Sequence, residues 1–289
     1  MRKINYLTFV KGIVLLCFVI PASGTYADEV RDWSKMPGSG TSLCMLEYEG
    51  RLYPYRIFFP STYRHAPDEE GGDIKKFPLV IACHPAGGDE IAYFEWKGNS
   101  DRIQTIAEKR GYVVACPAGP DGAWHVLTEG PAPAVAAKPE TPAIIMALLQ
   151  EITKQRQIDM SRVYLMGASS GALVTYATAA ANPDTFAAIA GVCGTFPEEA
   201  IDKLKQTPTL IFNARKDKLI PIQLMRERAH VLEKAGGKVK FVETSRGHGG
   251  YRDLETYALL FDWFEAHRRK SPKQKRQTRS ERRSKEQNI

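Results

Sequence analysis

The sequence predicts an α/β protein with a mostly parallel sheet and helices on both of its faces. From residue 79 to residue 263, strand-like apolar runs alternate with segments of helical length and periodicity. Before this region, two apolar runs separated by Glu49-Gly50 predict an antiparallel hairpin at one edge of the sheet. Polar loops follow several of the later runs, as is typical of the carboxyl edge of a parallel sheet.

The first 27 residues predict an export signal that is removed from the mature protein. A basic start with Arg2 and Lys3 precedes the apolar stretch 12–20, which is short for a membrane span. Small residues before Asp28 offer a cleavage site. We therefore expect a secreted or periplasmic protein, with an uncleaved membrane anchor as the alternative.

The body of the chain, residues 28–267, is expected to form one domain with the α/β pattern. Strands are expected at residues 43–48, 53–59, 78–83, 163–166, 209–212 and 239–242, with a further one ending at Cys116. Crossover helices are expected at residues 101–110, 142–154, 170–181, 222–235 and 254–267. The Pro/Ala-rich segment 130–135 is expected to be a loop.

The charge of the chain is concentrated at its two ends. The formal net charge is +7, but residues 1–27 carry three basic residues and no acidic one. Residues 268–289 carry ten Lys/Arg and two Glu, so the body between them has a net charge of −4. This basic tail has almost no apolar residue and is expected to be disordered. It either contacts an anionic surface or only adds solubility.

Residues 167–171, Gly-Ala-Ser-Ser-Gly, form the most informative motif of the chain. They lie between a predicted strand and a predicted helix, and Gly-x-Ser-x-Gly in that setting is typical of a nucleophile elbow. Such a turn strains the backbone of its serine and requires small residues two positions before and after it. Ser169 is therefore the candidate nucleophile.

A serine nucleophile needs a histidine base, which in turn needs a carboxylate to orient it. Asp217 lies in a polar loop after the predicted strand 209–212, and His248 lies in a glycine-flanked loop after the strand 239–242. Because all three candidates follow strand ends, we expect them at one edge of the sheet. Asp184 is a rival acid, but its surroundings are typical of a turn at a helix end. The other histidines are weaker candidates for the base: His65, His84, His125, His230 and His267.

The developing oxyanion needs backbone donors at the same edge. One is expected to be the N–H of Ser170, directly after the nucleophile. The other is expected in the loop His84-Pro85-Ala86-Gly87-Gly88, which follows the strand 78–83. Since Pro85 has no N–H, Ala86 is the favoured donor, with Gly87 as the alternative.

Taken together, these motifs resemble the secreted esterase branch of the α/β-hydrolase superfamily. That branch includes polyhydroxybutyrate depolymerases, feruloyl and acetylxylan-type esterases and the related prolyl oligopeptidase-like hydrolases. The resemblance covers residues 43–265 and is carried by residues 84–88, 109–117, 158–171 and 186–194 and by the loops of Asp217 and His248. It implies an eight-stranded, mostly parallel sheet. The chain departs from the family in having Pro85 where a glycine is usual, and Ala172 in place of a second glycine.

The predicted activity is hydrolysis of a carboxylic ester through an acyl-enzyme on Ser169. A polyester, a feruloylated or acetylated polysaccharide and a small soluble ester are the candidate substrates. Aromatic residues on loops of the same edge are expected to line the substrate cleft: Tyr93, Trp96, Trp124 and His125. A serine peptidase or acyltransferase with the same triad is the alternative enzyme. A non-catalytic protein that binds polysaccharide or a surface is the alternative outside enzymes.

Four cysteines remain after the leader: Cys44, Cys83, Cys116 and Cys193. An oxidising compartment would permit disulfides, and the resemblance implies that Cys83 and Cys116 end neighbouring strands. Buried free thiols are the alternative. No cysteine spacing predicts zinc, and no phosphate loop or dinucleotide fingerprint is present. Acyl transfer needs no cofactor, and no nucleic-acid partner is expected for an exported enzyme.

Overall fold

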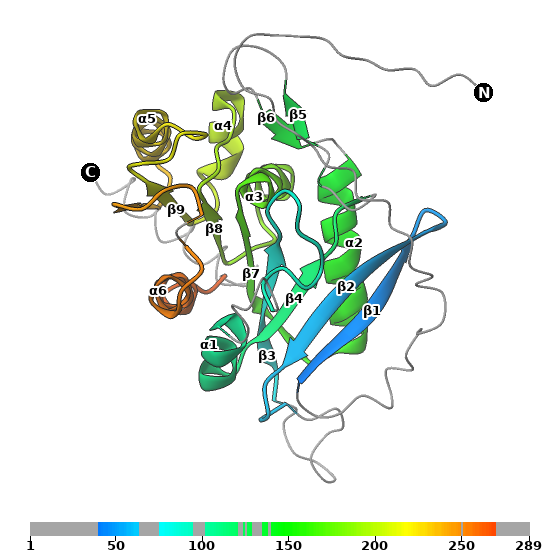
Figure 1. Cartoon of the computed structure of the whole chain (residues 1–289). Helices are drawn as coiled ribbons and strands as arrows, with labels where there is room; N and C mark the ends of the chain where they lie inside the picture. Colours follow the sequence, from blue (N-terminus) through cyan, green and yellow to red (C-terminus); the bar gives the residue numbers. More distant parts are fainter. Residues whose placement is uncertain are drawn as a thin grey trace, which may run out of the picture.

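The computed structural model describes residues 40–63, 75–94, 102–120, 124, 126–128, 135–137, 140–249 and 251–269. Within them, eight strands form one sheet in the order β1-β2-β4-β3-β7-β8-β9-β10 (Figure 1). The strands are β1 Gly40–Tyr48, β2 Arg51–Phe59, β3 Phe77–Cys83, β4 Val113–Pro117, β7 Ile158–Ala168, β8 Ala188–Val192, β9 Thr209–Ala214 and β10 Val239–Thr244. The predicted export signal lies outside the described residues.

The pairing of the strands confirms the predicted architecture. β1 and β2 form an antiparallel hairpin, and β2 also runs antiparallel to β4. From β4 to β10 every pair is parallel. The hairpin turns at Glu49 and Gly50, which both adopt positive φ angles, as a two-residue connection of twisted strands requires.

Helices cover both faces of the sheet, as Figure 1 shows. They are α1 Arg102–Arg110, α2 Glu140–Gln155, α3 Ser170–Ala181, α4 Ile201–Leu204, α5 Ile222–Lys234 and α6 Leu254–Glu265. Buried residues of α2 to α5 share one apolar core, and those of α1 and α6 share the other. In β3, Leu79 and Ile81 face the first core, and Val80 and Ala82 face the second. The central strands are therefore apolar throughout because both of their faces are buried.

Three features differ from the expectations or add to them. The short strands β5 Val126–Thr128 and β6 Val135–Ala137 form a separate antiparallel pair, and β6 begins at the end of the segment expected to be a loop. The short helix α4 and the 3₁₀ turn Glu198–Ala200 precede β9. The described residues also include Arg268 and Arg269, the first two residues of the predicted tail.

The four cysteines of the body are buried, and no disulfide joins them. Cys83 belongs to one apolar core and Cys116 to the other, so their side chains lie on opposite faces of the sheet. Among the described helices, none has both the length and the apolar character needed to cross a bilayer.

Candidate active site

Ser169 lies in a strained turn between β7 and α3. Its φ of 54° and ψ of −120° are rare for a residue with a side chain. A Cβ on Gly167 would lie 2.2 Å from the carbonyl oxygen of Gly171, and a Cβ on Gly171 would lie 2.0 Å from that of Cys83. Both glycines are therefore required by close backbone approaches, which is the geometry expected of a nucleophile elbow.

Asp217 is held by the loop between β9 and α5. Its Oδ1 accepts hydrogen bonds from the amides of Leu219 (2.8 Å) and Ile220 (2.9 Å). The side chain is fully buried, with 0% exposure. A carboxylate fixed by two amides has one oxygen left to face a partner, and Oδ2 points at His248.

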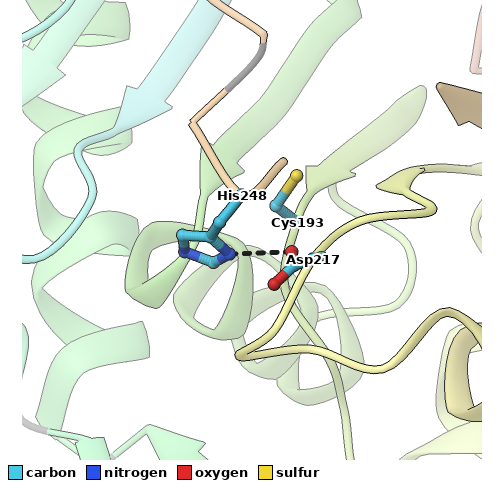
Figure 2. Close-up of side chains that lie close together, drawn as sticks. All are labelled: Cys193, Asp217 and His248. Carbon is cyan, nitrogen blue, oxygen red and sulfur yellow. Dashed lines mark hydrogen bonds and ion pairs between the residues drawn. The ribbon is translucent and has the colours of Figure 1, made fainter. Parts of the chain in front are cut away.

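His248 connects the other two side chains. Its Nδ1 lies 2.8 Å from Asp217 Oδ2, and its Nε2 lies 2.9 Å from Ser169 Oγ. Figure 2 shows the ring facing the carboxylate of Asp217. With Nδ1–H donating to the carboxylate, Nε2 is left as an acceptor for the serine hydroxyl. The structure thus brings the three predicted residues into one hydrogen-bonded chain at the carboxyl edge of the sheet.

The rival residues lie elsewhere. Asp184 follows the end of α3, whereas Ser169 precedes its start, and twelve helical residues span about 18 Å. His230 is exposed on α5. His267 is buried after α6, where its Nδ1 lies 2.7 Å from the carbonyl oxygen of Trp263. His65 and His125 lie outside the described residues.

The side chain of His84 fixes the loop after β3 through two hydrogen bonds to the backbone. The ring is fully buried, its Nδ1–H donates to the carbonyl of Pro85 (2.8 Å), and its Nε2 accepts from the amide of Gly119 (2.9 Å). Burial lowers the pKa of His84 to about 4, so the ring is neutral near pH 7 and can accept that bond. The carbonyl of Pro85 also accepts from the amide of Gly88 (3.0 Å). Although Pro85 has no N–H to donate, its carbonyl accepts two hydrogen bonds that stabilise the loop.

The two expected oxyanion donors lie on two neighbouring segments, the loop after β3 and the start of α3. Ala86 lies exposed on the loop, and Ser170 is the first residue of α3. The first amides of a helix have no acceptor within the helix, which leaves the N–H of Ser170 available to a ligand. A Cβ on Gly171 would lie 2.6 Å from the carbonyl oxygen of His84, so the start of α3 packs against the start of the loop.

The aromatic residues expected in the substrate cleft have a different setting. Tyr93 is buried, and its hydroxyl donates to the carbonyl of Cys83 (3.1 Å). Trp124 is also buried; its Nε1 donates to the carbonyl of His84 (2.7 Å), and its ring stacks on the imidazole at 4.9 Å. Both side chains thus donate hydrogen bonds to the backbone where β3 ends and the loop after it begins. Trp96 and His125 lie outside the described residues.

One residue near the site was not singled out from the sequence. Cys193 follows β8, and its Sγ lies within 4.8 Å of ligating atoms of Asp217 and His248. Its position directly after a strand at the same sheet edge was the available signal. Thiol, carboxylate and imidazole are a donor set that soft divalent cations favour. Both ring nitrogens of His248 already have partners, however. We therefore interpret the cluster as the His248–Asp217 pair of the candidate active site with a thiol beside it, and not as a metal site.

Sequence comparison finds relatives with esterase names. The profile of the Prolyl oligopeptidase family matches residues 136–203, which contain the elbow. Feruloyl esterase B of Neurospora crassa is 28% identical over 134 residues, covering 46% of this chain and 43% of that protein. Acetylxylan esterase of Coprinopsis cinerea is 28% identical over 127 residues, covering 43% and 33%. The matches thus span less than half the length of these two relatives.

A solved structure described as a thermostable esterase has the same fold. It superposes with a TM-score of 0.65 at 23% identity, covering 79% of this chain and 63% of that one. The strand order, the strained serine turn and the loop after β3 are those of the α/β-hydrolase fold. The relatives to which the chain is similar support an esterase branch of that superfamily.

Proposed function

We propose that this protein is an exported serine hydrolase that cleaves carboxylic esters. The observation that carries the proposal is the hydrogen-bonded chain from Ser169 through His248 to Asp217, with separations of 2.9 Å and 2.8 Å. A serine hydroxyl becomes nucleophilic near neutral pH when an imidazole accepts its proton and a buried carboxylate orients that imidazole. Export rests on the predicted signal at residues 1–27.

In the first half of the reaction, Ser169 Oγ attacks the ester carbonyl carbon while His248 Nε2 takes the hydroxyl proton. The carbonyl oxygen becomes an oxyanion and accepts hydrogen bonds from the N–H groups of Ser170 and Ala86. Asp217 stabilises the imidazolium through Nδ1. When the tetrahedral intermediate collapses, the C–O bond to the alcohol breaks, and the alcohol leaves with the proton held on Nε2.

In the second half, water replaces the alcohol. His248 takes a proton from the water as its oxygen attacks the acyl carbon on Ser169. The second tetrahedral intermediate uses the same oxyanion donors. Its collapse breaks the bond to Ser169 Oγ, which recovers the proton from Nε2, and the carboxylic acid is released. No further reactant is needed.

Esters of feruloyl or acetyl groups on plant polysaccharide are the substrate class that we propose first. The support is the naming of the two fungal relatives as a feruloyl esterase and an acetylxylan esterase. Polyesters and small soluble esters share the same bond and remain the other members of the test panel.

The central prediction concerns Ser169→Ala. The mature protein from Asp28 should hydrolyse p-nitrophenyl acetate, and the variant should lose about 10⁴-fold or more in kcat because the nucleophile is gone. Turnover should be followed by absorbance, and circular dichroism should show that the variant is folded. Activity of the variant close to that of the parent would contradict the proposal.

A second candidate is a serine peptidase, which the match to the Prolyl oligopeptidase family favours. The same three side chains would then attack an amide. Rates on matched ester and amide substrates with the same acyl group separate the two activities. Labelling of Ser169 by a fluorophosphonate, absent in Ser169→Ala, separates either enzyme from a non-catalytic binding protein.

A further inference from the structure

The end of β8 lies between the strand that leads to the nucleophile and the strand that leads to the acid. The amide of Ser169 donates to the carbonyl of Val192 (2.8 Å), and the amide of Cys193 donates to the carbonyl of Phe212 (2.8 Å) in β9. A Cβ on Gly194 would lie 2.9 Å from the carbonyl oxygen of Ser169. This short segment therefore contacts the elbow on one side and the acid-bearing strand on the other.

The thiol of Cys193 belongs to the surroundings of the His248–Asp217 pair. Its Sγ, a carboxylate oxygen of Asp217 and a ring nitrogen of His248 all lie within 4.8 Å of one another (Figure 2). Cys193 is 1% exposed. Burial and the neighbouring charge of Asp217 raise the pKa of the thiol to about 12. The group is therefore a neutral S–H, which can donate a hydrogen bond but is a poor nucleophile.

The carboxylate of Asp217 has room for this donor. Two amides, of Leu219 and Ile220, donate to Oδ1, and His248 donates to Oδ2. A carboxylate offers about four acceptor positions, so one is left over. The thiol of Cys193 is a polar group beside it in a pocket that buries the carboxylate completely.

The backbone of Cys193 adds to the argument because it is unfavourable for a cysteine. Its φ of 48° lies in the left-handed region, where glycine is common and residues with a side chain are strained. A glycine at this position would remove the strain and also the thiol.

We propose that Cys193 is a positioning residue for the acid of the site: its S–H donates to the carboxylate of Asp217 and holds that carboxylate toward His248 Nδ1. This inference rests on the proposed serine-hydrolase function. The thiol also offsets part of the negative charge that stabilises the imidazolium.

The first test compares Cys193→Ala with Cys193→Ser, since both variants keep a Cβ at the same backbone angles and only serine keeps a donor. Removing a weak donor to a charged acceptor should lower kcat about 3- to 10-fold in the alanine variant, with KM unchanged. The serine variant should retain most of the parent's kcat. Cys44→Ala, a buried cysteine on β1 at the far edge of the sheet, is the control and should keep full activity.

The second readout is the pH dependence of kcat/KM, whose acidic limb reports ionisation of the base. Without the S–H donor, the carboxylate of Asp217 stabilises the imidazolium of His248 more strongly. The acidic limb of the kcat/KM profile should therefore move to higher pH in Cys193→Ala and stay in place in Cys193→Ser. The other ionisable groups on the His248 loop, Arg246, Tyr251, Arg252 and Asp253, are the same in both variants. A role in packing alone would lower the unfolding temperature and leave the limb in place.

Cys193→Gly guards against failure of the alanine variant to fold, because glycine relieves the positive φ. It should lose kcat as alanine does, although it is less strained. Parent-like kcat and pH limb in the folded alanine or glycine variant would overturn the inference, while Ser169→Ala would still be inactive. Activity that survives Ser169→Ala would instead overturn the proposed function.

Discussion

At position 171 the chain has no room for a side chain, and the reason lies in two backbones that approach each other. A Cβ there would lie 2.0 Å from the carbonyl oxygen of Cys83 and 2.6 Å from that of His84. These oxygens belong to the end of β3 and the start of the oxyanion loop, so neither can move as a flexible side chain would. The glycine therefore sets the distance between the elbow and the loop that carries the second expected oxyanion donor, Ala86.

We predict that Gly171→Ala lowers the free energy of unfolding by about 2–4 kcal/mol, because a rigid contact must be relieved. The displaced loop should also lower kcat by at least about 100-fold through loss of oxyanion stabilisation. Denaturant unfolding and ester turnover measure the two effects. Gly249→Ala is the stability control, since a Cβ there meets nothing within 4 Å. Equal stability of the two variants would contradict the steric argument.

Single residues differ in how far the sequence could identify them. Ser169, Asp217 and His248 could be picked out because each follows a strand end, and the structure brings them together. Tyr93 and Trp124 were expected in the cleft, but an aromatic ring on a loop can face either solvent or core, and both are buried here. The place of Cys193 beside the site could not be predicted, because its neighbours Asp217 and His248 are distant in the sequence.

At the scale of elements, the loop that carries His248 is closed at its base by an ion pair. Arg246 Nη1 binds Asp253 Oδ2, and Asp253 Oδ1 also accepts from the amide of Thr256 (2.8 Å) as the N-cap of α6. One carboxylate thus joins the two ends of the loop and starts the next helix. Because His248 lies between them, the ion pair limits how far its ring can move.

We predict that Arg246→Ala lowers kcat about 2- to 5-fold with little change in stability, since a partly exposed ion pair contributes about 0–1 kcal/mol. Asp253→Ala should lower kcat similarly but should also cost about 1 kcal/mol more in stability, because it removes the helix cap. Thermal unfolding and steady-state kinetics of the two variants separate the effects. Unchanged kcat in both would show that the loop is fixed by other contacts.

Long periodic elements were predictable, and short ones were not. The helix expected at residues 170–181 has those bounds, and the one expected at 222–235 ends one residue earlier. The buried residues of α5, Met225, Ala229 and Leu232, recur with the helical period because one face packs on the sheet. Helix α3 is instead buried along most of its length. Helix α4 and the strands β5 and β6 have three or four residues each, too few for any period to be visible. Tertiary contacts decide such elements.

At the scale of the whole molecule, the C-terminal end of the described body is tied to the start of the central strand β7. Asp159 Oδ2 accepts from Arg162 (2.8 Å) and from Arg268 (2.6 Å), and Oδ1 accepts from the hydroxyl of Ser161 (2.6 Å). The amide of Arg269 donates to the carbonyl of Ser161 (2.9 Å). The first two residues of the predicted tail therefore fasten the segment after α6 to the central sheet.

This cluster predicts a pH dependence of stability. Burial opposes ionisation of Asp159, but the hydrogen bonds from Ser161 and Arg162 outweigh it and lower its pKa to about 2. A lowered pKa stabilises the folded state above the unfolded value near 4, and this contribution is lost as the pH falls toward 2. Asp159→Asn should therefore lower the free energy of unfolding by about 1–2 kcal/mol at pH 7 and by almost nothing near pH 2. Denaturant unfolding at both pH values measures this, and a pH-independent difference would contradict it.

The edge position of β10 has a consequence for how this protein is assembled. Within the described sheet, β10 pairs with β9 alone, its residues are partly buried or exposed, and the loop after it supplies His248. During synthesis this strand emerges after every other strand of the described sheet. Until β10 has paired with β9, Ser169 and Asp217 can be in place while His248 is not. Edge strands with little buried surface also detach before a sheet unfolds as a whole. Under the proposed function, ester turnover would report the docking of this last strand, whereas circular dichroism reports the folding of the rest.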